Sequence, residues 1–451
     1  MNITKKRPLP GNLTAQNFSY IYNPALECLT FTQSSCNMKE NAQEDLPMET
    51  RSHPANIGLD FAFDGGISEN VLRNYLSRAM TLGFLNPQHF SDPDYRRRCL
   101  EVIRDCGVKY VGRSNVAWIP EGSEQEWYST IRRAVKEVHE TDPDIILEAC
   151  IFETAYPCFG DFEIPAFVCE AFGIPYTGRR FCYEKMLFPD GTYVDHWEKD
   201  GSIPDMNQPE TQMWFYWRGC LYIDLGFEAL HYGQIWLIGE QDKNYRNWSK
   251  VMNMIRDYAR IHARRHFVLL NAHTHGCYDA NGKLMFDFHC YPIRPVAIAS
   301  DTPYHAPDGV TPQRCELIMG WGNSIFGRSM GGMTHSGWEC ESLPYFVEID
   351  NYGCQPPEFL NTPVDYYPWG YDECSWFAQQ PASYRAAWLR YAHDWIRQND
   401  PAGHLEMLGV RGISVYDETS PDKLSRRRYF IGETNDWITV RDIWQSEPEQ
   451  K

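Results

Sequence analysis

Acidic, basic and imidazole side chains recur at the ends of short apolar segments throughout most of this 451-residue chain. Each segment has the length of a strand, and polar side chains at C-terminal strand ends lie where parallel α/β folds bind ligands. A buried ionisable group is costly unless it is paired or used in chemistry, so their recurrence predicts a functional site. The candidates are Asp60, Arg113, Glu148, Glu240, His273, His275, Asp287, His289, Glu348, Asp350 and Glu406.

Carboxylates dominate this set, and paired carboxylates suit the hydrolysis of glycosidic bonds. One carboxylic acid of raised pKa protonates the leaving oxygen, while an ionised one attacks the anomeric carbon or activates water. Glu240 follows the apolar start of segment 234–242, and Glu348 lies near the end of segment 345–350. Asp350 shares the strand parity of Glu348 and is an alternative to it. This chemistry requires no cofactor.

The elements that position these side chains alternate between strands and helices. Strands are expected at 56–63, 108–113, 144–153, 234–242, 266–275, 284–289, 345–350 and 404–410. Helices are expected near 68–82, 92–105, 126–140, 213–233, 248–265 and 383–398. Eight strands alternating with helices indicate an α/β fold, a (β/α)8 TIM barrel, although the short link before 284–289 leaves no room for a helix.

Three regions are expected along the chain. Residues 1–50 are polar and form an N-terminal extension, residues 51–412 form the catalytic barrel, and residues 413–451 form a small C-terminal appendage. In the appendage, segments 428–431 and 437–440 are expected to be strands.

A barrel with one Glu ending strand four and another near the end of strand seven resembles the large retaining clan of (β/α)8 glycoside hydrolases. The resemblance is architectural, covers about residues 56–410 and indicates no specific family. It implies that Glu240 is the acid/base and Glu348 the nucleophile, with a retaining outcome. That clan has Asn before the strand-four Glu, where it bonds the sugar 2-hydroxyl, whereas this chain has Gly239. Substrate contacts there must differ, or the acid must be another group.

Aromatic residues follow several predicted strands on the side of the expected site. Pyranose rings stack their C–H faces on indole and phenol rings, so these residues could line a sugar cleft, or they could hold long loops in place. They are Trp118, Trp248, Trp321, Trp338, Tyr352 and Trp369. Trp118 and Tyr352 join the substrate-binding candidates, with Asp60, Arg113, Glu148, His273, His275, Asp287, His289 and Glu406.

The histidines permit a second hypothesis, a metal-dependent barrel hydrolase or lyase. His273, His275, Asp287 and His289 lie on two neighbouring predicted strands and are a plausible ligand set for Zn²⁺, Mn²⁺ or Fe²⁺. Metal-dependent barrels of the amidohydrolase type carry an HxH motif on their first strand, whereas here it lies on the fifth. The glycosidase hypothesis includes no metal.

Two further possibilities are a non-catalytic carbohydrate-binding barrel and a serine hydrolase. Residues 327–331 match GxSxG, but the nucleophile elbow needs a buried strand before the serine and a helix after it, and the flanking sequence is rich in turns. The motifs GxxxxGK[ST] and GxGxxG that bind nucleotides are missing.

Composition narrows the function classes. A net charge of −18 and a pI near 5.2 disfavour binding to nucleic acid or to an anionic membrane. The fifteen cysteines contain no CxxC pair, which disfavours a zinc or iron–sulfur motif. Without a signal-peptide pattern or a long apolar run, the chain is expected to be soluble and, by default, cytoplasmic, with a removed leader left open. The expected partner is a carbohydrate or glycoside; its sugar, its linkage and the oligomeric state stay open.

Overall fold

The computed structural model describes residues 53–86, 89, 92–116, 124–293, 295–297, 310–317, 319, 328–350, 372–417 and 420–447. The predicted extension at 1–50 and the aromatic candidates Trp118, Trp321, Tyr352 and Trp369 lie outside these residues.

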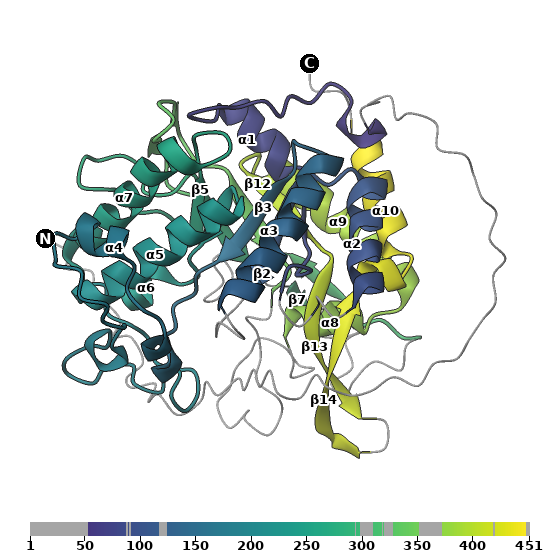
Figure 1. Ribbon diagram of the computed structural model, residues 1–451. Coiled ribbons are helices and arrows are strands. Elements are labelled where there is room, and N and C mark those ends of the chain that lie inside the picture. The colour runs from purple at the N-terminus through teal and green to yellow at the C-terminus, as the bar shows by residue number, and fades with distance from the viewer. Residues whose placement is uncertain are drawn as a thin grey trace, which may run out of the picture.

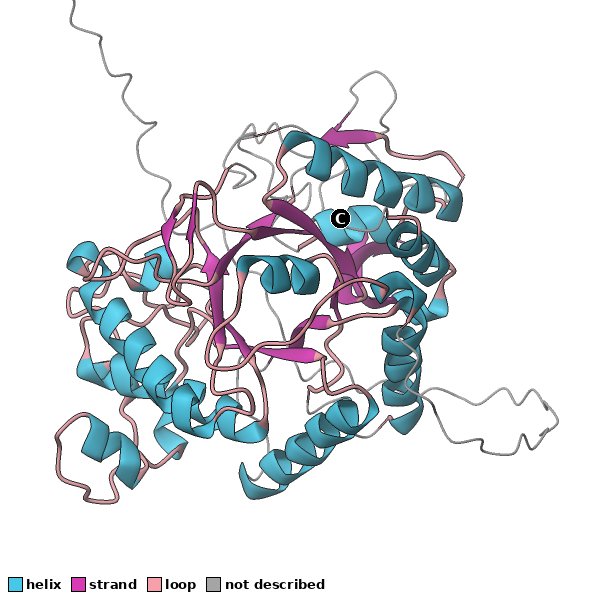
Figure 2. Cartoon of the chain, turned by 90° about the horizontal axis from the view of Figure 1, so that it is seen from above, coloured by secondary structure: helices cyan, strands magenta, loops and turns pink. Residues whose placement is uncertain are grey.

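Eight parallel strands close into a barrel in the order β1-β12-β11-β6-β5-β4-β3-β2 (Figure 2). The strands are β1 (Ala79–Thr81), β2 (Tyr110–Val116), β3 (Ile146–Cys150), β4 (Ala229–His231), β5 (Leu269–His273), β6 (Phe288–Pro292), β11 (Tyr345–Glu348) and β12 (Gly403–Leu408). The predicted TIM barrel is therefore confirmed.

Helices surround the barrel (Figures 1 and 2). The longer ones are α2 (Pro93–Cys106), α3 (Glu124–Thr141), α5 (Pro209–Leu225), α7 (Arg246–His262), α9 (Ala382–Asn399) and α10 (Asp436–Gln445). The shorter ones are α1 (Glu69–Leu76), α4 (Ala166–Ala171), α6 (Ile235–Ile238), α8 (Glu373–Ala378) and the 3₁₀ turns at Pro54–Asn56, Pro157–Asp161, Tyr183–Lys185, Lys243–Tyr245 and Ile431–Glu433.

Among the residues that the structure describes, three two-stranded sheets lie outside the barrel, and each is antiparallel. They pair β7 (Pro295–Ala297) with β8 (Cys315–Leu317), β9 (Gly332–Met333) with β10 (Glu339–Cys340), and β13 (Val410–Asp417) with β14 (Ser420–Phe430).

The prediction of the first strand at 56–63 was wrong. The first barrel strand is β1, which lies inside the predicted helix 68–82, because helix α1 ends at Leu76. The apolar side chains of 56–63 pack instead at the N-terminal end of the barrel, where Phe61 contacts Tyr75 of α1 edge to face. Figure 2 shows α1 crossing this end of the barrel.

The prediction of the fourth strand at 234–242 was also wrong. Helix α5 ends at Gly226, which adopts the left-handed conformation (φ 97°) that glycine favours at a helix C-terminus. Strand β4 follows three residues later, inside the predicted helix 213–233. The apolar run after it forms the single-turn helix α6, so strand four ends before Glu240 is reached.

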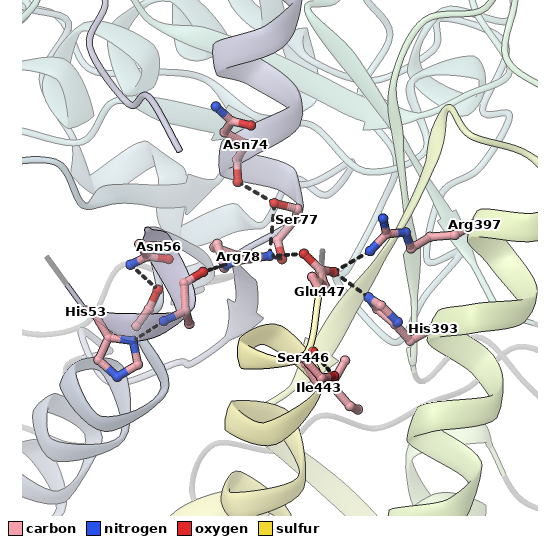
Figure 3. Close-up of polar contacts among 12 residues, drawn as sticks. His53, Asn56, Asn74, Ser77, Arg78, His393, Arg397, Ile443, Ser446 and Glu447 are labelled. Atoms are coloured by element: carbon pink, nitrogen blue, oxygen red, sulfur yellow. Dashed lines mark hydrogen bonds and ion pairs between the residues drawn. The ribbon is translucent and has the colours of Figure 1, made fainter. Parts of the chain in front are cut away.

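The C-terminal segment differs from its prediction as well. Residues 428–430 belong to β14, as expected for a strand, but 437–440 lie within helix α10. Glu447, just after α10, receives hydrogen bonds from Arg78 (2.8 Å) and Arg397 (2.6 Å) and lies 2.8 Å from His393 Nε2 (Figure 3). This ion cluster fixes the residue after α10 to the segment before β1 and to α9.

The apolar core has two parts that follow from the alternation of side chains along the strands. Outward side chains of the strands pack against the surrounding helices and form the larger part. The smaller part fills the N-terminal half of the barrel interior and includes Ala79, Tyr110, Ile146, Ala229, Leu269, Phe288 and Phe346. Within the described residues, no helix is long and apolar enough to cross a membrane.

Candidate active site

Arg113 reaches the barrel interior because strand β2 is irregular. The register between β2 and β3 shifts between Val111 and Asn115, and Arg113 has a positive φ of 49°. Such a bulge redirects a side chain, and a left-handed non-glycine residue costs about 1–3 kcal/mol, a combination common at functional sites. The interior position before it is Gly112, where an added Cβ would lie 1.7 Å from Glu406 Oε1.

The Arg113 guanidinium gathers the side chains at the C-terminal end of the barrel. Its Nη2 forms an ion pair with Glu348 and lies 3.3 Å from Asp350 Oδ2 and 3.2 Å from His273 Nε2. His273 Nε2 is also 3.2 Å from Glu348 Oε2. A second guanidinium, on Arg411, lies 3.2 Å from Asp350 Oδ1. Two cations therefore face two carboxylates.

These two carboxylates are held in the ionised form. Burial alone would raise the pKa of Glu348, but attraction to Arg113 and His273 outweighs it and holds that pKa well below its usual range. The pKa of Asp350 is lowered in the same way, against burial, by Arg113 and Arg411.

The pKa values of two other carboxyl groups, those of Glu406 and Glu148, are raised rather than lowered. Burial raises the pKa of Glu406 well above its usual range, and the negative charges of Glu348 and Glu148 raise it further. Burial also raises the pKa of Glu148, although Tyr110 Oη (2.5 Å) and the Arg113 backbone N–H (2.8 Å) donate to its carboxyl group. We call Arg113, Glu148, His273, Glu348, Asp350 and Glu406 the central cluster.

The pKa of a third carboxyl group, that of Glu153, is also raised by burial. It follows β3, it is 4% exposed, and its electrostatic partners include His273 of the central cluster. Gln234 Nε2 donates to its Oε1 (3.3 Å), whereas its Oε2 has no hydrogen-bond partner within the described part of the chain. Gly233 leaves room for this oxygen, because a Cβ there would lie 1.9 Å from it. Trp197 Nε1 donates to the Glu153 carbonyl (3.1 Å).

A hydrogen-bonded network lies beside Glu148 and Glu348 in the barrel. Asn271 Nδ2 donates to Glu148 Oε1 (2.8 Å), and Asn271 Oδ1 lies 2.6 Å from His231 Nδ1 and 3.1 Å from Cys290 Sγ. Burial, with help from His273 and Arg113, lowers the pKa of His231 to about 3, so its imidazole is neutral.

Glu240 lies apart from this cluster. It is exposed in the turn after α6, and it interacts with Tyr193 of the long β3–β4 connection, whose pKa is raised to about 12 by burial and by the hydrogen bond to Glu240. The premise that Glu240 ends strand four is corrected, because that strand is β4.

Four other predicted site residues lie elsewhere. Asp60 is exposed in the loop before α1, at the N-terminal end of the barrel. Asp287 precedes β6 and pairs with Arg256 of α7 (2.8 Å), outside the barrel interior. His289 lies on the outward face of β6, and His275 is exposed after β5. The predicted metal ligand set of His273, His275, Asp287 and His289 is therefore not brought together.

The GxSxG serine has a structural environment on the outside of the barrel. Ser329 Oγ lies 3.1 Å from His289 Nδ1 and 2.9 Å from Tyr291 Oη, and all three side chains are buried. Burial lowers the pKa of His289 to about 3. These contacts attach the segment after Gly327 to β6.

Two predicted aromatic candidates are also placed away from the cluster. Trp248 is fully buried in α7 against Phe215 and Tyr232, and Trp338 donates its Nε1 to the Ile67 carbonyl (2.8 Å) near α1. Both hold elements together.

Sequence reasoning did not select Glu153, the last residue of the predicted third strand, and it missed His231, Cys290 and Arg411. If the predicted helix had been ended at Gly226, the fourth strand would have been placed after it, in the segment that contains His231. Arg411 directly follows the predicted eighth strand, 404–410. Cys290 follows the predicted sixth strand, which in the structure is shifted toward the C-terminus.

Comparisons with known proteins add little. No family model and no curated protein matches the chain. Among solved structures, it is similar to a GH27 β-L-arabinopyranosidase from Geobacillus stearothermophilus, with 12% identity and a TM-score of 0.27. The match covers 48% of this chain and 54% of that chain, and at this TM-score it carries no argument about function.

Proposed function

We propose that this protein hydrolyses a glycosidic bond with a pair of carboxyl groups at the C-terminal end of the barrel, Glu348 as the ionised member and Glu153 as the proton donor. One observation supports this most strongly. Two buried carboxyl groups that both interact with His273 carry opposite pKa shifts, lowered at Glu348 and raised at Glu153. Separated pKa values are what acid catalysis of leaving-group departure and nucleophilic attack require.

Each residue of the pair has a supporting environment. Arg113 and His273 keep Glu348 charged, so the carboxylate is ready to attack an anomeric carbon. Glu153 Oε2 has no hydrogen-bond partner among the described residues, which leaves its proton for a leaving oxygen. Asp350 is the alternative nucleophile, because it shares Arg113 with Glu348. Glu406, the register partner of Glu348 on β12, and Glu148 on β3 would set the charge of the centre.

The test is a panel of aryl glycosides assayed with the wild type and with the variants Glu348→Gln and Glu153→Gln. We expect Glu348→Gln to lose at least 10³-fold in kcat/KM, and Glu153→Gln to lose about 10²–10⁴-fold with a poor leaving group but little with dinitrophenolate. The alkaline limb of the pH profile should disappear in Glu153→Gln, since that limb reports the proton donor.

Glu240→Gln is the matched control, because this carboxylate is exposed and lies outside the central cluster. Full activity in Glu240→Gln with loss in the other two variants would support the pair. Loss in Glu240→Gln with an unchanged Glu153→Gln would return the acid role to Glu240. A 2-fluoro glycoside that labels Glu348 would identify it as the nucleophile and indicate retention, whereas a label on Asp350 would transfer the role.

A further inference from the structure

A second donor set lies in the same barrel, next to the carboxylates. A ring nitrogen of His231, the sulfur of Cys290 and a carboxylate oxygen of Glu348 all lie within 4.8 Å of one another. The three residues come from β4, β6 and β11, and each is at most 2% exposed. Imidazole, thiolate and carboxylate are donors that Zn²⁺ accepts, and the sulfur favours it over Mg²⁺ or Ca²⁺.

The tautomer of His231 leaves one nitrogen available as a ligand. Asn271 Nδ2 donates to Glu148, so the Asn271 oxygen faces His231 and accepts from Nδ1 (2.6 Å). The proton is thus on Nδ1, and Nε2 keeps its lone pair. His231 Nε2 is buried and has no hydrogen-bond partner in the described part of the chain. Metal-bound histidines typically donate their other N–H to a carbonyl oxygen in this way.

A neighbouring trio is a weaker candidate for a cation. His273, Glu348 and Asp350 also offer ligand atoms within 4.8 Å of one another. However, Nη2 of Arg113 contacts all three, so a guanidinium already occupies the position between them. In the trio of His231, Cys290 and Glu348, Arg113 pairs with Glu348. The hydrogen bonds of His231 and Cys290 go to the neutral Asn271 amide, and the His231 ring lies edge to face with the His273 ring, 4.8 Å between centroids.

We propose that His231, Cys290 and Glu348 form a binding site for Zn²⁺ or a similarly soft divalent ion. Three protein ligands leave a fourth position for water, as in many zinc sites. Binding forms the sulfur–metal bond and releases the Cys290 S–H proton to solvent, so one metal ion taken up should release about one proton. If the proposed glycosidase function holds, bound zinc occupies Glu348 and inhibits the enzyme.

The direct experiment titrates the metal-free full-length protein with Co²⁺ and follows the thiolate-to-cobalt charge-transfer absorption. We expect one equivalent to bind in the wild type, and the band to be lost in Cys290→Ser and His231→Gln. Cys220→Ser is the matched control, since Cys220 is equally buried but lies on α5. Absence of the band in the wild type, or its persistence in Cys290→Ser, would overturn the proposal.

A measurement on the wild type alone covers the case in which the variants fail to fold. X-ray absorption of the zinc-loaded protein should give one sulfur ligand with nitrogen and oxygen ligands, and a shell of oxygen alone would rule out the site. Activity separates the two proposals. A protein that binds zinc but hydrolyses no glycoside contradicts only the function, and an active protein that ignores zinc contradicts only the metal site.

Discussion

Replacing Arg113 by Met should destabilise the protein strongly at neutral pH. The substitution leaves the Glu348 and Asp350 carboxylates, which are 2% and 3% exposed, without their shared cation. Removing one partner of a buried ion pair costs about 3–5 kcal/mol. With about 2.1 cal/mol/K of unfolding entropy per residue over 451 residues, a loss of 4 kcal/mol lowers Tm by roughly 4 °C.

The loss of stability in Arg113→Met should be larger at neutral pH than at acidic pH. In the wild type the pKa values of Glu348 and Asp350 are depressed, so their stabilisation is present above the unfolded values near 4 and is lost as the pH falls through the folded ones. In Arg113→Met, burial dominates and raises these pKa values, so the destabilisation is present at high pH and is relieved on acidification. The difference in stability between the two proteins should therefore shrink below about pH 5.

The assay is chemical or thermal unfolding of both proteins from pH 4 to 8. Arg97→Met is the matched control, because Arg97 is 59% exposed and pairs with the surface carboxylates Asp94 and Glu101. The Tm of this variant should not change measurably. The double variant Arg113→Met/Glu348→Gln should recover part of the loss, since one buried charge is removed. Wild-type stability in Arg113→Met at pH 7, or a loss that grows on acidification, would refute the reasoning.

Two further predictions concern packing and the chain terminus. Gly112→Ala should destabilise by about 1–3 kcal/mol, because its Cβ would overlap Glu406, whereas Gly412→Ala, with no atom within 4 Å of the new Cβ, should be neutral in the same unfolding assay. Glu447→Gln should lower Tm at pH 7, since Glu447 has a pKa of about 2 that Arg78 and His393 depress against burial. The wild-type advantage should be present above about pH 4.5 and disappear near pH 2, and a constant difference across that range would contradict the role of the charge.

The architecture could be predicted from the sequence because most strands and helices carry local signals. Helix α2 illustrates this: Asp92 caps its start, Pro93 occupies the first turn, and Gly107 ends it in the left-handed conformation. Strands β5 and β11 are short apolar runs that end in polar residues, so His273 and Glu348 were expected at the C-terminal end of the barrel.

The secondary structure was predicted wrongly where the local sequence pattern is compatible with both a strand and a helix. The run 234–238 is apolar enough for a buried strand, yet it forms the one-turn helix α6, because β4 had already completed the barrel beside β3 and β5. Three-residue strands such as β1 and β4 are too short for a periodic signal. Their place is set by pairing with neighbouring strands, which is a long-range property.

The sequence by itself determined the alternation of strands and helices, and with it the barrel and the end at which polar groups collect. Only the tertiary structure decided which of those groups meet. Closure of the barrel brings Arg113, His273 and Glu348 together from strands up to 235 positions apart in the chain, and the bulge in β2 turns Arg113 inward against the regular alternation. The physical reason is that local periodicity fixes the face of each side chain, whereas pairing and charge compensation in a buried interior depend on every strand at once.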